Sequence, residues 1–325
     1  MNLDHALTAR ENLFDEKHET ACRLFNGFTE GQPNLVIDLY ARTAVLYNYA
    51  KPVEAGQDNL EVAQQFLLNR LPWLSAIIVK DRFGLYDSMK RGRLMYGDKA
   101  DRHIREHGVR YAVELTMNQD SSFYLDTRNL RRWIIDNLHG KQVLNTFAYT
   151  GSLGVAAYAG GAVRVIQTDL NRQFLNVAKT SYTLNGFPIR KPEFMIGDFW
   201  SLVNRLKRAG EQFDAVFLDP PFFAATKKGR VDLAHNSARL INKVRPLVRH
   251  GGYLVAINNA LFVSGQAYLD TVQSVCADGH VSIEQFIPVP DDCVGYALDP
   301  PSPITDPAPF NHATKIIVLR IFHKR

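Results

Sequence analysis

The sequence is poor in the residues and motifs that would place it in several large classes of protein. Three cysteines among 325 residues, with no CxxC pair, give neither a disulfide framework nor a cysteine-rich zinc site. No apolar run approaches the roughly 18 residues that a membrane-spanning helix needs, and residues 1–10 lack the apolar stretch of a signal peptide. Neither GxGxxG nor GxxxxGK[ST] occurs, which disfavours a pyrophosphate-bearing nucleotide. These absences predict a reduced, cytoplasmic protein with no membrane partner.

The composition is that of a globular protein with a modest basic excess. Hydrophobic residues make up 46% and charged residues 22%, and the formal net charge is +5. The bases are clustered, however: residues 80–110 carry nine bases and five acids, and residues 203–250 carry ten bases and four acids. Two such segments beside one cleft would follow a phosphate backbone. Solvated loops and helix faces of an ordinary basic protein explain the same charges equally well.

The order of patterns along the chain predicts two domains behind a short N-terminal arm. Residues 1–20 form the arm, and residues 21–105 read as a small α+β domain of β-β-α-β type. A hairpin is expected from 111–116 and 122–125, and a helix over 127–138. Strands are then expected at 142–146, 164–168, 193–196, 215–218, 253–257, 283–287 and 315–322. The expected intervening helices are 151–159, 171–185, 199–209 and 232–248, and the Pro-rich stretch 288–309 is expected to be one long loop.

Alternating strands and helices with short connections indicate a mostly parallel, seven-stranded sheet with helices on both faces. Ligands bind at the carboxyl ends of such strands. Gly151 lies in the turn after the first strand, Asp169 ends the second, and Asp198 with Phe199 follows the third. An acid after the second strand can accept hydrogen bonds from both hydroxyls of a ribose, and Asp198 and Phe199 suit an adenine. Together these residues favour a nucleoside without pyrophosphate, which fits S-adenosylmethionine.

The sharpest motif follows the fourth strand and reads Asp219-Pro-Pro-Phe-Phe223. Two prolines fix the backbone and remove two donors, so Asp219 and the carbonyls around Pro220 remain as acceptors for an exocyclic amino group. Phe222 or Phe223 would stack on a flipped base, and Asp219 would also contact the cofactor. A rigid turn with core phenylalanines is the structural alternative.

The motifs from about Asn26 onward resemble those of the bacterial class I methyltransferases that make 5-methylcytosine in large-subunit ribosomal RNA. The matching segments are SFYLDTRN at 122–129, NTFAYTG at 145–151, TD at 168–169, LN at 184–185, GD at 197–198 and DPPFF at 219–223. The resemblance implies a Rossmann-like methyltransferase domain over residues 106–325. It further implies that S-adenosylmethionine is bound by Phe147, Tyr149, Gly151, Asp169 and Asp198, with Asp126 and Arg128 capping it.

Two departures from that family shape the predicted chemistry. Family members begin with an RNA-binding PUA domain, which is not expected here because only about 20 residues precede the small domain, so RNA affinity is expected from the basic segments, including Lys227 and Lys228, or the substrate differs. Family members also use a cysteine after the fifth strand, where this chain has Ala256-Ile-Asn-Asn-Ala260. Cys293, in the Pro-rich loop, has no supporting motif. Asn258 and His312 are further candidates for catalysis and for substrate contact, respectively.

The sequence therefore predicts a class I S-adenosylmethionine-dependent methyltransferase that acts on a base in ribosomal or other RNA. A base nitrogen is favoured over cytosine carbon 5, because attack by nitrogen needs no covalent adduct. The expected product of the cofactor is S-adenosylhomocysteine, and no metal is expected. Two alternatives stay open: a methyltransferase of a small molecule or protein, and a non-catalytic protein that binds S-adenosylmethionine or RNA. The sequence also leaves a homodimer open.

Overall fold

The computed structural model describes residues 2–226, 228–297 and 302–323. The chain divides into two compact units. The first unit comprises Met1–Asp126 and Pro290–Ser302, and the second comprises Thr127–Val289 and Pro303–Arg325. Within the described ranges, no helix combines the length and the apolar character required to cross a bilayer.

The first unit is built on a five-stranded sheet in the order β1-β2-β3-β4-β5. Its strands are β1 (Ala21–Asn26), β2 (Leu35–Tyr40), β3 (Thr43–Asn48), β4 (Ala76–Asp81) and β5 (Arg93–Tyr96). Only β3 and β4 pair in parallel, because the helix α2 (Gln57–Arg70) carries the chain back between them. The helix α1 (Leu3–Thr8) buries Leu3, Ala6 and Leu7 in the same hydrophobic cluster as α2 and the sheet, so the predicted arm is part of the core.

The first unit continues past the predicted boundary at residue 105 because later residues pack on its sheet. The hydroxyl of Tyr40 donates to the Phe123 carbonyl at 3.1 Å, and the hydroxyl of Tyr47 lies 2.6 Å from that of Ser121. The predicted hairpin of 111–116 with 122–125 is wrong. The hairpin pairs β6 (His103–Glu106) with β7 (Val109–Ala112), since the two residues between these strands both adopt the positive φ of a tight turn.

Part of the Pro-rich stretch also belongs to the first unit, contrary to the prediction of one long loop. It contains the short helix α10 (Asp291–Val294), which contacts β1. The Asp292 carboxylate accepts from the Arg23 amide at 2.9 Å, and the Asn26 side chain donates to the Cys293 carbonyl at 2.9 Å. The buried guanidinium of Arg10 donates to the Asp292 carbonyl at 2.9 Å. Buried polar partners thus fix this segment to the sheet.

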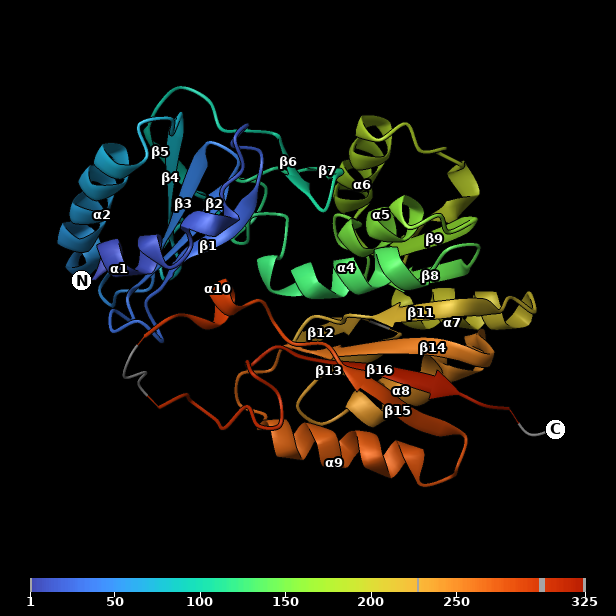
Figure 1. The fold of residues 1–325 in the computed structure, drawn as a ribbon. Helices are drawn as coiled ribbons and strands as arrows, with labels where there is room; N and C mark the ends of the chain where they lie inside the picture. Colours follow the sequence, from blue (N-terminus) through green and yellow to red (C-terminus); the bar gives the residue numbers. More distant parts are fainter. Residues whose placement is uncertain (1, 227, 298–301, 324–325) are drawn as a thin grey trace. The chain divides into compact units, whose positions relative to one another are not determined.

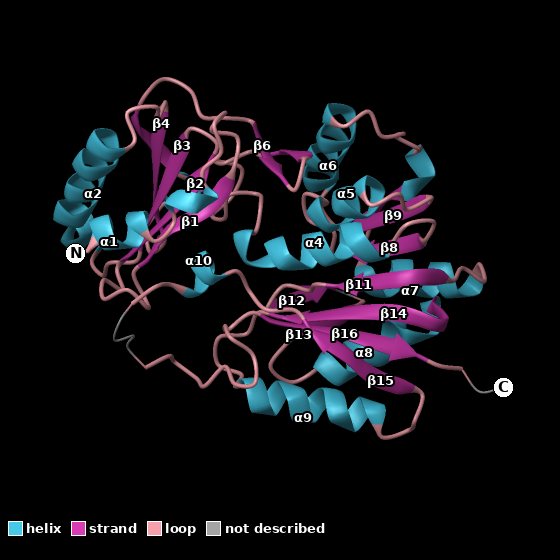
Figure 2. Cartoon of the chain, viewed as in Figure 1, coloured by secondary structure: helices cyan, strands magenta, loops and turns pink. Residues whose placement is uncertain are grey.

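The second unit holds a seven-stranded sheet in the order β10-β9-β8-β11-β14-β16-β15 (Figures 1 and 2). Its strands are β8 (Gln142–Thr146), β9 (Arg164–Asp169), β10 (Phe194–Ile196), β11 (Phe213–Leu218), β14 (Val248–Asn258), β15 (Val281–Phe286) and β16 (Lys315–Ile321). The first five in sheet order are parallel and β16 alone runs against its neighbours. This order confirms the predicted Rossmann-like class I fold.

In the described part of this unit, six helices are longer than one turn: α4 (Arg128–Asn137), α5 (Ser152–Ala159), α6 (Arg172–Leu184), α7 (Phe199–Arg208), α8 (Ser237–Val244) and α9 (Gly265–Cys276). The last three share one hydrophobic cluster with the sheet. The helix predicted over 232–248 is shorter than expected, because residues before it pair as the hairpin of β12 (Phe223–Thr226) with β13 (Gly229–Asp232). This hairpin directly follows the Asp219-Pro-Pro-Phe motif.

Candidate active site

The predicted site residues of the second unit gather at the carboxyl ends of its parallel strands. In sheet order, β8 lies between β9 and β11 (Figure 1). From β8 the chain first builds β9 and β10 on one side of the sheet and then crosses to build β11 and β14 on the other side. Ligands of open α/β sheets bind at such a reversal. The side chain of Thr146 ties the two central strands together there, since its hydroxyl donates to the Phe217 carbonyl at 2.6 Å. The loops after β8, β9, β10 and β11 therefore form one candidate active site.

The loop after β8 adopts an unusual backbone conformation. Phe147 has φ 53°, Tyr149 has φ 50° and Gly151 has φ 79°. Positive φ costs free energy in residues other than glycine, so neighbouring contacts must hold the loop in place. The Ala148 amide donates to the Thr168 carbonyl at 2.9 Å, and the Tyr149 amide donates to the Asp169 carboxylate at 2.8 Å. Strain of this kind concentrates at ligand-binding loops.

Gly151 is required at its position for two reasons. Its φ lies in the left-handed region, and a Cβ there would lie 2.5 Å from the Ala178 Cβ and 2.8 Å from the Gln167 side-chain nitrogen. The same Gln167 accepts from the Asn145 side chain at 2.9 Å and is fully buried. The start of α5 therefore packs closely on β9, and the first backbone amides of α5 lie at the carboxyl edge of the sheet.

Asp169 has the acceptor capacity that a ribose would need. Its half-buried carboxylate accepts from the Tyr149 amide at 2.8 Å and from the Asn171 amide at 2.8 Å. A carboxylate offers about four lone-pair positions, so these two bonds do not exhaust its capacity to accept from ribose hydroxyls. Burial raises the pKa of Asp169, and the backbone amides of Asn171, Tyr149 and Leu170 oppose that rise. The residues present fit the nucleoside that the sequence predicted.

Asp198 lies at the start of α7, where it caps the helix. One carboxylate oxygen accepts from the Ser201 amide at 3.2 Å, and the other accepts from the Thr226 hydroxyl at 2.6 Å. The carboxylate thus links the cofactor side of the site to the β12–β13 hairpin. An adenine amino group would have to share this carboxylate with Thr226, or replace it.

The predicted stacking residue Phe199 is buried and lies against Phe147, with ring centroids 4.5 Å apart and an interplanar angle of 25°. One face of Phe199 is therefore already covered by Phe147, a residue of the loop after β8. The sequence analysis missed two other residues, Leu170 and Ile196, which are large, apolar and exposed. Ile196 pairs with Asp169 in the sheet, and Leu170 follows Asp169 directly. The signal that could have identified them was an apolar residue within two positions of each acid, Leu170 directly after Asp169 and Ile196 two residues before Asp198.

The Asp219-Pro-Pro-Phe-Phe motif forms the turn between β11 and the β12–β13 hairpin. Asp219 is half-buried and Pro220 is buried, whereas Phe222 is 44% exposed and Phe223 is 51% exposed. The Arg230 guanidinium lies 4.8 Å from the centroid of the Phe223 ring. The structural alternative of core phenylalanines is therefore wrong, since both rings reach solvent. Exposed rings beside a rigid acceptor turn suit a planar substrate.

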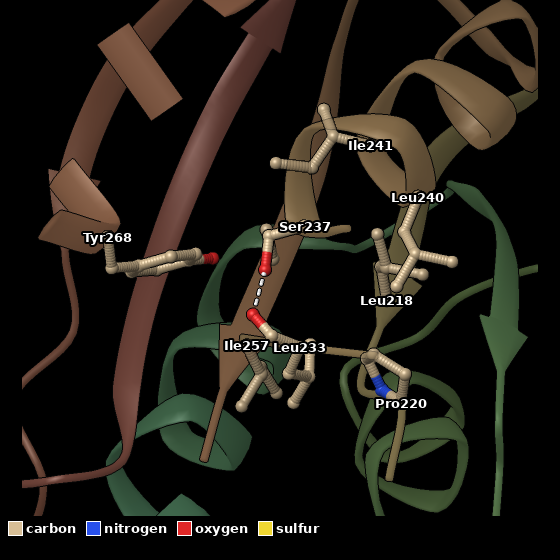
Figure 3. A pocket seen from close by; sticks show the side chains of 9 residues that line it. Leu218, Pro220, Leu233, Ser237, Leu240, Ile241, Ile257 and Tyr268 are labelled. Carbon is tan, nitrogen blue, oxygen red and sulfur yellow. Dashed lines mark hydrogen bonds between the residues drawn. The ribbon is translucent and has the colours of Figure 1, made fainter. Parts of the chain in front are cut away.

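Pro220 also lines a small pocket behind this turn (Figure 3). The other lining residues are mostly apolar: Leu218, Leu233, Ser237, Leu240, Ile241, Ala256, Ile257 and Tyr268. The Ser237 hydroxyl donates to the Leu233 carbonyl at 2.8 Å. Figure 3 shows the Tyr268 ring on the side of the pocket opposite Pro220. The back of the turn is thus packed on the core while its rings face outward.

Asn258 does not present itself to a substrate in this structure, contrary to the predicted catalytic role. It is fully buried. Its amide nitrogen donates to the Leu233 carbonyl and the Ser237 hydroxyl, each at 3.2 Å, and its oxygen accepts from the Ala260 amide at 2.9 Å. All its polar groups are used to join β14 to the segment before α8. Asn258 therefore positions the chain behind the motif.

The other predicted substrate residues lie in loops of the second unit. His312 is half-buried in the segment before β16, and its ring nitrogen accepts from the Thr314 amide at 3.0 Å. Lys228 is exposed in the turn of the β12–β13 hairpin, while Lys227 is outside the described residues. Asp126 ends the first unit and Arg128 begins α4 in the second, so their predicted capping of the cofactor stays a prediction.

No cysteine of this chain is placed at the motif by the described residues. Cys22 and Cys293 are fully buried in the first unit. Cys276 ends α9, just before β15 begins at Val281, and β15 begins at the amino edge of the parallel strands. Burial raises the pKa of the Cys276 thiol. In the described part of the chain, no group of three or more His, Cys, Asp or Glu is arranged to hold a metal ion.

Comparison with known proteins agrees with this geometry. Residues 87–290 match the family described as S-adenosylmethionine-dependent methyltransferase. The chain is 28% identical over 303 residues to a protein of Photobacterium profundum named ribosomal RNA large subunit methyltransferase I, covering 92% of this chain and 73% of that one. The fold matches the crystal structure of SMU.776 complexed with SAH, with a TM-score of 0.83, 21% identity and coverage of 99% and 82%. It also matches an S-adenosylmethionine-dependent methyltransferase of Agrobacterium tumefaciens, with a TM-score of 0.64, 17% identity and coverage of 96% and 93%.

Proposed function

The chain belongs to the family of S-adenosylmethionine-dependent methyltransferases, and from that premise we propose that it methylates a base nitrogen in RNA, with ribosomal RNA as the substrate. S-adenosylmethionine supplies an electrophilic methyl group on a sulfonium. The single observation that carries the proposal is the acceptor turn at Asp219, flanked by two exposed phenylalanine rings, beside a loop and carboxylate suited to a nucleoside. We also propose that it acts in the cytoplasm and needs no metal.

On the cofactor side, residues of this chain bind and orient. Asp169 would accept from both ribose hydroxyls, with its position fixed by the amides of Tyr149 and Asn171. Leu170 and Ile196 would cover the faces of the adenine, and Asp198 would accept from its amino group. The left-handed conformation of Gly151 lets the backbone approach the rest of the cofactor closely. These contacts would hold the methyl group at the reversal point of the sheet.

On the substrate side, Asp219 and the carbonyls of the proline turn would accept hydrogen bonds from an exocyclic amino group. Such bonds orient the nitrogen lone pair toward the methyl group and stabilise the positive charge that develops on nitrogen as the bond forms. A proton then leaves the methylated nitrogen, and the Asp219 carboxylate would receive it or pass it to water. Phe222 and Phe223 would stack on the base, which must leave its helix to reach the turn.

The position of the cysteines supports nitrogen over cytosine carbon 5 as the acceptor. Methylation at carbon 5 requires a thiolate that adds to carbon 6 of the ring. Cys22 and Cys293 are fully buried, and Cys276 lies at the opposite edge of its sheet from Asp219. An amine, in contrast, needs only orientation and acceptors, which the turn at Asp219 offers.

RNA is favoured as the substrate by the surface beside the turn and by the relatives. The β12–β13 hairpin presents Arg230 beside the exposed ring of Phe223 and Lys228 in its turn, which suits a base with its phosphate. The relative from Photobacterium profundum carries the name of a ribosomal RNA methyltransferase. An enzyme that acts on a small molecule would enclose its substrate, so aromatic rings exposed to solvent would not be expected at its site.

The test is methyl transfer from labelled S-adenosylmethionine to RNA extracted from cells that lack the gene, followed by mass spectrometry of nucleosides. Asp219→Ala should reduce labelling by about 10²-fold or more while cofactor affinity stays within a few-fold, and Asp219→Asn should retain part of the activity because an amide oxygen still accepts. Asp214→Ala, at the other end of β11, is the matched control and should remain active. Label in 5-methylcytosine would refute the nitrogen assignment, and no labelled nucleoside would refute RNA as substrate.

A further inference from the structure

The first unit presents a second group of exposed rings, which the proposed site does not use. β3 and β4 are parallel and end in register, with Asn48 opposite Asp81. The residues that follow the two strands therefore emerge at the same edge of the five-stranded sheet (Figure 2). They are Tyr49 and Lys51 after β3, and Arg82 and Phe83 after β4.

Several large side chains at this edge are open to solvent although they could pack on a core. Phe83 is 45% exposed and Tyr86 is 69% exposed, and Leu85 and Phe28 are also exposed. Phe28, which follows β1, contacts Tyr49 edge to face with ring centroids 4.9 Å apart. Exposed apolar groups gathered in one place usually mark an interaction surface.

Cations lie on the rings of this edge. The Lys51 ammonium is 3.7 Å from the centroid of Phe83, and the Arg82 guanidinium is 5.7 Å from the centroid of Tyr49. Arg82 is held from behind, since it donates to the Gln119 carbonyl at 2.6 Å and to the Asp120 carboxylate at 3.2 Å. Two further bases, Lys90 and Arg91, end the short helix α3 (Asp87–Arg91) that follows Tyr86.

We propose that this surface, formed by Phe28, Lys51, Arg82, Phe83 and Tyr86 and called here the aromatic edge, binds unpaired nucleotides of the RNA substrate. Single-stranded RNA is bound by exposed rings that stack on bases and by cations that follow the phosphates, and both kinds of group alternate here. A surface that binds a hydrophobic protein partner would instead consist of apolar side chains, without cations lying against its rings. The inference rests on the proposed function for the identity of the RNA, but binding at the aromatic edge needs no methyl transfer.

The aromatic edge is tested by fluorescence anisotropy of a labelled single-stranded RNA oligomer of random sequence, titrated with the full chain at several KCl concentrations. The double variant Phe83→Ala, Tyr86→Ala should bind this RNA roughly tenfold to a hundredfold more weakly, because each lost stack removes a base contact. Lys51→Glu should weaken binding and also reduce the dependence of log affinity on log salt concentration by about 0.7 for each lost phosphate contact.

Matched controls separate this loss from a general effect on surface rings or charge. Phe322→Ala removes a ring that is 38% exposed, beyond the end of β16 at the amino edge of the second unit's sheet. Lys17→Glu changes an exposed lysine before β1. Both controls should bind the oligomer as the unaltered chain does, and the thermal unfolding of all four variants should be alike within a few degrees.

Failure of the aromatic edge and failure of the proposed function give different results. Asp219→Ala should lose methyl transfer but keep RNA affinity, whereas the aromatic variants should lose affinity and raise the KM for RNA with cofactor affinity unchanged. The inference is overturned if the unaltered chain shows no salt-dependent RNA binding, or if the aromatic variants bind as tightly as the controls. It is also overturned if those variants keep RNA affinity but change sedimentation, which would identify a surface for self-association.

Discussion

The carboxylate of Asp169 provides the sharpest single perturbation, because it serves the protein and the cofactor at once. Asp169→Asn keeps the shape of the side chain but removes the charge and replaces one acceptor oxygen by a donor. In the unaltered protein both oxygens already accept from backbone amides, of Tyr149 and Asn171, at 2.8 Å each. The amide group of the variant therefore meets at least one N–H donor and can no longer accept from both ribose hydroxyls.

The magnitudes follow from these bonds. Hydrogen bonds to a charged acceptor contribute about 1.5–3 kcal/mol each, so losing the equivalent of two weakens S-adenosylmethionine binding by roughly 3 kcal/mol, or about a hundredfold. The cofactor-free protein should change much less. Burial raises the pKa of Asp169, so the ionised side chain is itself costly in the folded state, and removing the charge offsets much of the lost amide contact. We expect a change of about 1 kcal/mol or less in the free energy of unfolding.

Titration calorimetry gives the affinity, and thermal unfolding with and without cofactor gives the stability. Asp214→Asn is the control: Asp214 also accepts from a backbone amide, that of Gln142 at 2.8 Å, but at the amino edge of the sheet. It should lose stability without losing affinity. Affinity of the unaltered protein should also fall as pH is lowered through the raised pKa of Asp169, and that dependence should vanish in Asp169→Asn. Undiminished binding by Asp169→Asn would refute the assignment of the ribose site.

Three further predictions test the loop, the hairpin and the first unit. Gly151→Ala should destabilise the chain by more than the roughly 1–2 kcal/mol that a left-handed alanine costs, because its Cβ would collide with the Ala178 side chain of α6. The control Gly186→Ala, with φ 67° and open space around the position, should cost only that amount. Equal losses of stability in thermal unfolding would contradict the packing argument. Thr226→Val removes the 2.6 Å bond to Asp198 and should raise the KM for RNA while cofactor affinity holds or improves, and a loss of cofactor affinity in calorimetry would count against it. Burial lowers the pKa of Lys80 from 10.5 to about 7. Between these two pH values the unfolded chain carries a proton on Lys80 that the folded chain has released, so the free energy of unfolding should rise with pH. Urea unfolding from pH 7 to 9 should show this rise in the unaltered protein and not in Lys80→Met.

The strands and helices of the second unit were largely predictable, because each has a clear periodicity and a sharp end. The expected strand at 142–146 is β8 as predicted, and the expected helix at 199–209 ends one residue from the end of α7. The β12–β13 hairpin was missed because its sequence, FAATKKGRVD, has few strand-forming residues and is held by contacts such as that of Thr226 with Asp198. The α10 segment was missed for a similar reason, since its partners on β1 are distant in sequence.

The candidate site divides in the same way. The match of residues 87–290 confirms the family resemblance that the motifs at Gly151, Asp169 and Asp219 carried. Phe199 and Asn258 were placed at the right strand ends, but the pattern could not tell which way their side chains point. The structure buries both, and it exposes Leu170 and Ile196 instead. Residue type after a strand indicates the edge of the sheet, whereas access to a ligand depends on packing from other elements.

The amino-acid order by itself determined the alternation of strands and helices, the parallel sheet and the acids at the ends of its strands, because these depend on local periodicity and on chain connectivity. Only the tertiary structure decided which of those side chains remain available. Asp198 shares its carboxylate with Thr226, Phe147 covers one face of Phe199, and burial removes Cys22 and Cys293 from solvent. Each of these outcomes depends on groups that come together from distant parts of the chain, and burial there decides which side chains are exposed and which can carry a charge.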